Sequence, residues 1–383
     1  MKKNKKVFVI IVAIIILLLL CIIIPEQYRK IQYGGFKTIG LLKRARSNHK
    51  SILIDKFILT YGGEKIPGMK YDSIETYDIQ ANKSEMLSND IAKRLELTNL
   101  DIVKVWNDYL IIYRKGMHSK NIEATLSYYN FKNKKFERII KPKYDDYYAD
   151  FFVLSNGDVV LYTNKNSEKY SYANNNFVKL IPQTEKKEHE LNLFYNIPTI
   201  VALNKDSFLL ISTSSANVYE NDTFKPVEKI QFNVGDFSNF YHIGEQAPKF
   251  IALDNGKFAV FSYDKKTHLN KIRIYEYKNS KIELISTYET KRIWHALSSG
   301  RILKIKNDEI VILGGKYGIP SILMFNTGQC YIFNIKENRL YRISSLKNDN
   351  DTFSSVIYSE KIYMIGGYQN EYKKEIDVLE LNR

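Results

Sequence analysis

The chain has 383 residues, of which 44% are hydrophobic and 13% aromatic, enough for a large core rich in strands. Its formal net charge is +15, but no segment alternates basic with aromatic residues, so we do not expect it to bind nucleic acid. Two distant cysteines (Cys21 and Cys330) and six scattered histidines exclude a disulfide framework and a preformed zinc site, and we expect no metal and no cofactor.

The first 35 residues predict a membrane anchor. Residues 7–24 form an uninterrupted apolar run of 18 residues, which spans about 27 Å as a helix, near the minimum for a bilayer core. Four lysines precede the run, so the positive-inside rule predicts a cytoplasmic N-terminus at 1–6 and a short tether at 25–35. A cleaved signal peptide and a lipoprotein modified at Cys21 are the alternatives. However, no small-residue cleavage site precedes Pro25, and Leu20 stands where a lipobox requires a small residue.

Residues 36–383 contain a repeated apolar strand. Its seven copies start between 49 and 52 residues apart, a period typical of propeller repeats. With a strand before it and two after it in each repeat, the spacing predicts an all-β, seven-bladed propeller. Because the N-terminus is expected in the cytoplasm, the propeller should lie outside the cell membrane, extracellular or periplasmic. The copies are Phe57–Tyr61, Tyr109–Tyr113, Val159–Thr163, Phe208–Ser212, Phe258–Ser262, Ile310–Gly314 and Ile362–Gly366.

Short polar turns connect the predicted strands. Asn156–Gly157 and Asn255–Gly256 each separate the first two strands of a repeat, and such pairs favour hairpins with positive φ at both residues. The third strand of a repeat ends in an aromatic residue followed, in most copies, by a polar one. These pairs are Tyr77–Asp78, Tyr129–Asn130, Tyr172–Ala173, Tyr219–Glu220, Tyr275–Glu276 and Phe333–Asn334.

The repeat resembles the kelch repeat. The segment Lys56–Asp78 has the strand, double glycine, polar loop and Tyr-Asp ending of that repeat, and Arg46 and His49 resemble its Arg-x-x-His lead-in. The resemblance implies a propeller like the central domain of galactose oxidase. We expect its double glycines to have a structural role, with positive φ and close approach of a neighbouring blade. They are Gly62, Gly63, Gly314, Gly315, Gly366 and Gly367.

The seventh repeat lacks its fourth strand, because the chain ends soon after the third. Residues 36–42 (FKTIGLL) have the pattern of the missing strand. We therefore expect them to close the ring as the outer strand of the last blade, which removes an open sheet edge.

Two clusters of loop residues are candidates for binding. Aromatic faces beside carboxylates suit a sugar or a cationic partner, and a basic and aromatic cluster suits a sugar or an anion. Packing of the rings between blades is the alternative for both clusters. The first contains Tyr144, Asp145, Asp146, Tyr147, Tyr148 and Asp150, and the second contains Arg292, Trp294 and His295.

No catalytic residues can be assigned from the sequence, because it contains no nucleophile motif and no paired metal-ligand spacing. We therefore expect a membrane-anchored, non-enzymatic binding module whose partner is a cell-envelope glycan, an anionic polymer or a protein. The alternative is a carbohydrate-active enzyme, of the epimerase, oxidase or hydrolase kind, that uses loops at the mouth of the channel.

Overall fold

A computed structural model describes residues 12, 24, 28–29, 34–66, 69–70, 73–88, 95, 97–98, 101–114, 123–143, 150–162, 167–180, 199–211, 216–227, 229–230, 249–264, 269–290, 295–297, 300–306, 308–319, 323–346, 352–369 and 371–381. Apart from residues 12 and 24, the predicted membrane segment 7–24 lies outside these ranges. Within them, no helix has the length and apolarity needed to cross a bilayer.

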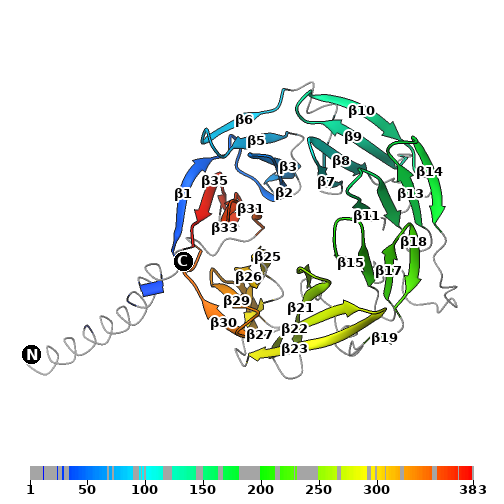
Figure 1. The fold of residues 1–383 in the computed structure, drawn as a ribbon. Coiled ribbons are helices and arrows are strands. Elements are labelled where there is room, and N and C mark those ends of the chain that lie inside the picture. The colour runs from blue at the N-terminus through cyan, green and yellow to red at the C-terminus, as the bar shows by residue number, and fades with distance from the viewer. Residues whose placement is uncertain are drawn as a thin grey trace, which may run out of the picture.

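The chain forms a ring of seven blades, each built on four antiparallel strands, as the repeat predicts (Figure 1). The first strand of each blade lies nearest the axis. These first strands are β2 (Ser47–Ile54), β7 (Ile102–Trp106), β11 (Asp150–Val153), β15 (Thr199–Ala202), β20 (Lys249–Ala252), β25 (Arg301–Lys306) and β31 (Ser354–Tyr358). The second strands are β3 (Phe57–Ile66), β8 (Tyr109–Arg114), β12 (Val159–Tyr162), β16 (Phe208–Ile211), β21 (Lys257–Asp264), β26 (Glu309–Leu313) and β32 (Lys361–Ile365).

The two remaining strands complete each blade toward its outer edge (Figure 1). The third strands are β5 (Glu75–Asp78), β9 (Thr125–Asn130), β13 (Ser167–Ser171), β17 (Ala216–Glu220), β22 (Leu269–Lys278), β29 (Cys330–Asn334) and β35 (Glu375–Leu379). The fourth strands are β6 (Lys83–Met86), β10 (Lys135–Ile140), β14 (Asn176–Leu180), β18 (Thr223–Pro226), β23 (Lys281–Thr290), β30 (Arg339–Arg342) and β1 (Phe36–Leu41).

Short additional strands extend two of the blades and form two small separate sheets. One two-residue strand pairs with the second strand of the first blade, and another adds in parallel to the outer strand of the fifth blade. Small hairpins follow the second strands of the last two blades. These strands are β4 (Met69–Lys70), β19 (Lys229–Ile230), β24 (His295–Ala296), β27 (Lys316–Ile319), β28 (Leu323–Asn326), β33 (Tyr368–Gln369) and β34 (Glu371–Tyr372).

The hydrophobic core lies between neighbouring blades. In β12, all four residues are buried, because both faces of a second strand are covered by adjacent sheets. One cluster, for example, joins Phe261 of the fifth blade to Ile310 and Phe333 of the sixth. Each of the seven interfaces between blades has such a cluster. Every blade therefore depends on its neighbours for burial of both faces.

The first and last strands of the propeller lie side by side (Figure 1). β1 pairs antiparallel with β35 from Phe36, opposite Leu379, to Leu41, opposite Glu375. The side chain of Thr38 donates a hydrogen bond of 2.6 Å to that of Asp377. The blade that contains the C-terminal strand therefore takes its outer strand from the N-terminal part of the chain.

The double glycines have the backbone that the sequence predicts. All six have positive φ, with Gly63 at 89° and Gly366 at 56°. A Cβ on Gly63 would lie 2.6 Å from the backbone oxygen of Ser47, and one on Gly366 would lie 2.9 Å from that of Arg46. Backbone atoms cannot move aside as a side chain can, so these positions require glycine.

Two details of the turns differ from the prediction. Asn255 and Gly256 both have positive φ, but only Gly157 of the Asn156–Gly157 pair does. In the third blade, the residue paired with Val159 is Tyr170, the equivalent of the predicted aromatic position. Tyr172 lies in the following turn, where its backbone N–H donates to Asp158. The local pattern of alternating tyrosines therefore placed this strand two residues too late.

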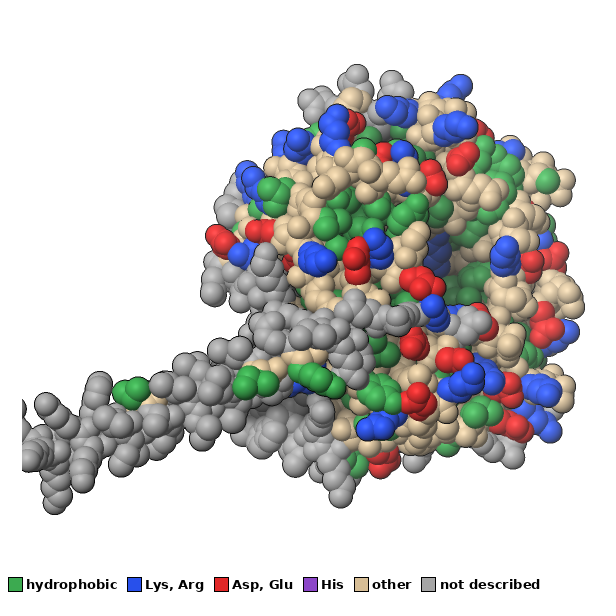
Figure 2. All heavy atoms as spheres, turned by 60° about the vertical axis from the view of Figure 1, so that its left-hand side comes forward, with side chains coloured by type: hydrophobic (Ala, Val, Ile, Leu, Met, Phe, Trp, Pro, Cys, Tyr) green, Lys and Arg blue, Asp and Glu red, His purple; other side chains and the backbone are tan. Residues whose placement is uncertain are grey.

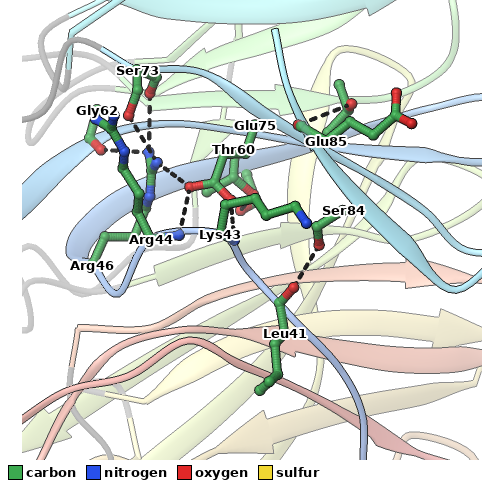
Figure 3. A network of polar contacts seen from close by, with 12 residues as sticks. Leu41, Lys43, Arg44, Arg46, Thr60, Gly62, Ser73, Glu75, Ser84 and Glu85 are labelled. Carbon is green, nitrogen blue, oxygen red and sulfur yellow. Dashed lines mark hydrogen bonds and ion pairs between the residues drawn. The ribbon is translucent and has the colours of Figure 1, made fainter.

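The Arg46 side chain anchors the start of the first blade through a buried polar network (Figure 3). Its guanidinium lies 2.5 Å from the carboxylate of Glu75, and both side chains are fully buried. It also donates to the backbone oxygens of Gly62 and Ser73. The Glu75 carboxylate accepts hydrogen bonds from the backbone N–H groups of Lys43 and Arg44, between β1 and β2. This network connects the closing strand to the first blade.

Candidate functional site

A cavity of about 420 Å³ lies on the axis of the ring. The first strands of five blades supply most of its wall, and these strands lie nearest the axis, where the blades converge. Its volume falls within the range of about 300–1,000 Å³ typical of small-molecule sites. The residues that line it are His49, Lys50, Ser51, Ile52, Tyr61, Ile102, Val103, Lys249, Arg301, Ile302, Leu303, Ser354 and Ser355.

Three positive charges face this cavity. Lys249 and Arg301 begin the first strands of the fifth and sixth blades, and Lys50 is the fourth residue of the first strand of the first blade. The described residues that line the cavity include neither Asp nor Glu. Over the outer face shown in Figure 2, by contrast, basic and acidic side chains are interspersed. Among the described lining residues, the formal charges are therefore all positive.

The three cations occupy one equivalent position of the repeat. Each is paired with a corresponding residue of its second strand: Lys50 with Tyr61, Lys249 with Phe261, and Arg301 with Leu313. In the other four blades, the same register position is occupied by Ile102, Asp150, Thr199 and Ser354. A basic residue at this position is therefore not a requirement of the blade.

Each cation also contacts the next blade. Lys50 donates to the backbone oxygen of Asp101 at 2.8 Å, and Lys249 donates to that of Gly300 at 2.5 Å. Arg301 donates through Nε to the backbone oxygen of Phe353 at 3.1 Å. These bonds hold the side chains against the wall of the cavity, so the positive charges have defined positions before any ligand arrives.

The environment of the cavity changes the protonation of two groups. Burial, and then the nearby Arg301 guanidinium, lower the pKa of Lys249 to about 8. Burial, with smaller contributions from Arg46 and Arg301, lowers the pKa of His49 to about 3. At neutral pH, Lys249 is therefore still mostly charged, whereas His49 is neutral.

A chain of hydroxyl groups follows the wall between the first and seventh blades. The Oγ atom of Ser354 lies 2.8 Å from Nε2 of His49 and 2.6 Å from Oγ of Ser51. Ser51 in turn contacts Thr60 at 3.0 Å. Although Ser354 and His49 have the spacing of a nucleophile and its base, a histidine with a pKa near 3 is a poor proton acceptor at neutral pH.

Other basic side chains near the axis have acidic partners. Lys104 of β7 lies 3.3 Å from the carboxylate of Asp150, and Lys304 of β25 lies 2.6 Å from that of Asp254. Neither lysine is among the residues that line the cavity. Each of these two lysines is therefore paired with a carboxylate of a neighbouring blade.

The structure describes only part of the site predicted from sequence. Asp150 starts β11, half-buried, beside Lys104. The backbone of His295 starts β24, where it pairs with Tyr317. The other predicted residues lie outside the described ranges: Tyr144, Asp145, Asp146, Tyr147, Tyr148, Arg292 and Trp294.

Lys50, Lys249 and Arg301 were not among the residues predicted from the sequence to form a site. A signal was present, since each occurs seven to nine residues before the start of a repeated strand, in KSILI, KFIA and RILKIK. Single basic residues in a chain with 57 Lys and Arg have little individual weight. Their significance becomes evident only when the ring brings three blades to one axis.

A second cavity, of about 490 Å³, lies between the third and fourth blades. Its wall includes Lys169, whose ammonium lies 2.8 Å from Asp222 and 3.2 Å from Asp158. Opposite charges are thus paired within this cavity. Among the described residues, no three His, Cys, Asp or Glu side chains are grouped so that they could hold a metal ion.

Comparisons with known proteins identify the class of fold. No protein-family model and no curated protein matches the chain. Among solved structures, it is similar to a fungal alcohol oxidase of the AA5 family in complex with copper, at 10% identity and a TM-score of 0.58. That match covers 91% of this chain and 76% of the oxidase.

It is also similar to the β-propeller domain of Cps50 (Swd1) from Myceliophteria thermophila, at 10% identity and a TM-score of 0.54, covering 91% of this chain and all of that domain. A third match, the protein YjhT, has a TM-score of 0.45 at 9% identity and covers 90% of this chain and 96% of YjhT. At such low identity, the first two similarities establish only the fold. The protein is a seven-bladed β-propeller.

Proposed function

We propose that this protein is a membrane-anchored, extracytoplasmic, kelch-like propeller that binds a ligand in its axial cavity without chemically changing it. The partner is a component of the cell envelope: a glycan, an anionic polymer or a protein. The observation that carries the proposal is the 420 Å³ axial cavity with its fixed polar side chains, because rigid concave sites of this size are typical ligand sites.

The anchor is the apolar run 7–24, with four lysines before it. The tether of residues 25–35 reaches at most about 40 Å when fully extended, so the propeller operates close to the bilayer. Such an arrangement suits a protein that holds an envelope component near the membrane.

Binding is favoured over catalysis by the protonation of the cavity. The pairing of Ser354 with His49 would need a histidine that accepts a proton near neutral pH, and the low pKa of His49 opposes this. The similarity to an alcohol oxidase reflects the fold and transfers no activity. A carbohydrate-active enzyme is therefore the second candidate, with loops at the mouth of the cavity as its site.

Two measurements test the proposal. In fractionated cells, the full chain should sediment with membranes and require detergent for release, whereas a chain that begins at residue 25 should not. Residues 36–383, incubated with purified envelope glycan and anionic polymer, should retain one of them and return it unchanged in mass. Formation of a product would overturn the binding proposal in favour of the enzyme.

A further inference from the structure

We propose that the second cavity, of about 490 Å³ between the third and fourth blades, binds a neutral glycan through its amide, hydroxyl and carboxylate side chains. The inference goes beyond the proposed function, because this cavity and the axial cavity have no described lining residue in common. It therefore assigns a second site, and it names the class of ligand that the site takes.

Three tight turns supply most of the wall of this cavity. They are the turn between the first two strands of the third blade, the same turn of the fourth blade, and the turn between the last two strands of the fourth blade. In an antiparallel blade, all of these turns lie at one end, opposite to the end where Lys249 and Arg301 begin their first strands. The second cavity therefore belongs to the other face of the ring.

Hydrogen bonds fix these turns before any ligand arrives. The backbone N–H of Ser155 donates to the Asp206 carboxylate at 2.8 Å, which connects the third blade to the fourth. The backbone N–H of Asp206 donates to the side chain of Asn204, also at 2.8 Å. Asn221 and Asp222 both have positive φ, at 51° and 59°, as a two-residue hairpin turn requires. The lining is thus ordered in advance, which reduces the entropic cost of binding.

The lining suits a ligand rich in hydroxyl groups. Ten of its eleven described residues have polar side chains, among them three asparagines, three carboxylates and two serines. A sugar hydroxyl both donates and accepts hydrogen bonds, and an asparagine amide does the same. Asn221 and Ser207 form no side-chain hydrogen bond with another described residue. Their amide and hydroxyl groups are therefore available to a ligand.

The charges of the lining oppose an anionic ligand. The carboxylates of Asp206, Glu220 and Asp222 accompany one lysine, Lys169, so three negative charges and one positive charge give a net charge of −2 for the described lining. Hydrogen bonds from Ser155 and from Lys169 lower the pKa of Asp206 and of Asp222 respectively, so both carboxylates are ionised at neutral pH. An anionic polymer would be repelled here.

A cationic ligand is also disfavoured, because the carboxylates already have partners in the protein. The ammonium of Lys169 lies 2.8 Å from Asp222, and the Tyr277 hydroxyl donates to Glu220 at 3.1 Å. Among the described residues, no group of acidic side chains could hold a metal ion. The chain as a whole carries a charge of +15, which repels a polycation. A neutral ligand that donates hydrogen bonds to these fixed carboxylates fits the cavity better.

A cluster of half-exposed aromatic rings adjoins the cavity. The indole N–H of Trp106 donates to the backbone oxygen of Ser155, which belongs to the cavity lining, at 2.9 Å. The centroid of the Trp106 ring lies 5.3 Å from that of Tyr109 and 5.1 Å from that of Tyr172. Both tyrosine hydroxyls donate to Glu137, which holds the rings in place. Because the C–H faces of sugars pack on aromatic rings, a glycan in the cavity can extend onto this cluster.

The experiment measures binding by titration calorimetry to residues 36–383, which contain every strand of the seven blades. The probes are maltotetraose, mannotetraose and chitotetraose as neutral sugars, polyphosphate as an anion and poly-lysine as a cation. We expect at least one tetrasaccharide to bind, and neither charged polymer to displace it. Asn221→Gly and Ser207→Ala should each weaken binding about three- to tenfold, as expected for loss of one neutral hydrogen bond.

A matched variant separates the site from the fold. Asn279→Gly removes the same amide from the equivalent turn of the fifth blade, where Asn279 also has a φ of 51°. Glycine retains this backbone in both turns, so neither Asn221→Gly nor Asn279→Gly should change the melting temperature. Asn279 is not among the residues that line the second cavity, so only Asn221→Gly should weaken binding of the sugar.

The fluorescence of Trp106 tests the aromatic part of the site. Binding of the tetrasaccharide should change the intrinsic fluorescence of the chain. Trp106→Phe keeps an aromatic ring and should remove most of this change. A change of equal size in Trp106→Phe would show that the glycan does not reach the aromatic cluster, and would overturn that part of the inference.

Other outcomes would overturn the site as a whole. Absence of binding by all three tetrasaccharides, or equal affinity of Asn221→Gly and Asn279→Gly, would exclude the second cavity as a glycan site. Displacement of the sugar by poly-lysine would indicate a cationic ligand instead. Loss of sugar binding in Lys249→Gln but not in Asn221→Gly would place the sugar in the axial cavity, which overturns the second site and leaves the proposed function intact.

Discussion

The buried pair of Arg46 and Glu75 provides the sharpest test of how the ring is closed. We consider Glu75→Gln, which keeps the shape of the side chain and removes its charge. The Glu75 carboxylate is fully buried and accepts hydrogen bonds from the Arg46 guanidinium at 2.5 Å and from the backbone N–H groups of Lys43 and Arg44 at 2.6 and 3.2 Å. A glutamine would direct an NH2 group at one of these donors and leave the buried Arg46 charge uncompensated.

The size of the effect follows from this geometry. Breaking a buried ion pair by removing one charge costs about 3–5 kcal/mol of folding free energy. With an unfolding entropy of roughly 2 cal/mol/K per residue over about 350 residues, this corresponds to a drop in melting temperature of roughly 4–7 °C. The loss of stability should be largest at the closing strand β1, because Lys43 and Arg44, which connect β1 to β2, donate to Glu75.

The assay is calorimetric melting of residues 36–383, together with hydrogen exchange of β1 and β35. Glu85→Gln is the control, because Glu85 lies in the same blade and pairs with Lys83 at 2.7 Å, but both side chains are more than 60% exposed. Exposed pairs contribute little, so the control should melt like the unaltered chain. If Glu75→Gln also melts unchanged, or if β1 and β35 exchange as slowly as before, the reasoning about the buried pair is wrong.

Two further predictions concern the same junction. The pKa of His49 falls from 6.5 to about 3 on folding, so as the pH is lowered the unfolded chain takes up a proton before the folded chain does. The contribution of neutral His49 to stability is therefore complete above about pH 6.5 and declines as the pH falls toward 3. At pH 5 the loss is about 2 kcal/mol. Urea titrations from pH 7 to 5 should show this slope, and His49→Asn should flatten it; an equal slope in both would contradict the assignment. The second prediction compares residues 43–383, which lack β1, with residues 36–383. Loss of β1 exposes the edge of β35, so it should lower the melting temperature strongly and promote aggregation. Equal melting temperatures of the two chains would refute closure by this strand.

The architecture was predictable because the repeat is expressed in the buried second strands. Equivalent residues of these strands, such as Ile58, Leu110 and Ile362, are fully buried. The position must therefore be apolar in each blade, and the apolar strands recur at a regular spacing although the loops differ. The prediction was least accurate where several residues of one type occur together. Tyr170 and Tyr172 satisfy the local pattern equally well, and only pairing with Val159 selects Tyr170.

The candidate site could not be predicted in the same way. Lys50, Lys249 and Arg301 are separated by up to 251 residues along the chain, and each resembles an ordinary surface charge in its own repeat. Their common feature depends on the closed ring, which places the starts of the first strands around one cavity. Asp150 occupies the equivalent position in its blade, but Lys104 neutralises it. The same repeat position therefore has opposite charges in different blades, so no local sequence motif identifies the residues that line the cavity.

The location of the cavity relates ligand binding to ring closure. His49 and Ser354 line the cavity and also join the first blade to the seventh, at 2.8 Å. Three residues before His49, Arg46 holds the same junction through Glu75 on one side and through a backbone bond to Gly367 on the other. The wall of the cavity is thus also the point where the two ends of the propeller meet. A propeller that failed to close there would lose the fixed positions of the side chains that line the cavity. Gly366 and the buried charge of Glu75 are therefore required for the site as well as for the fold.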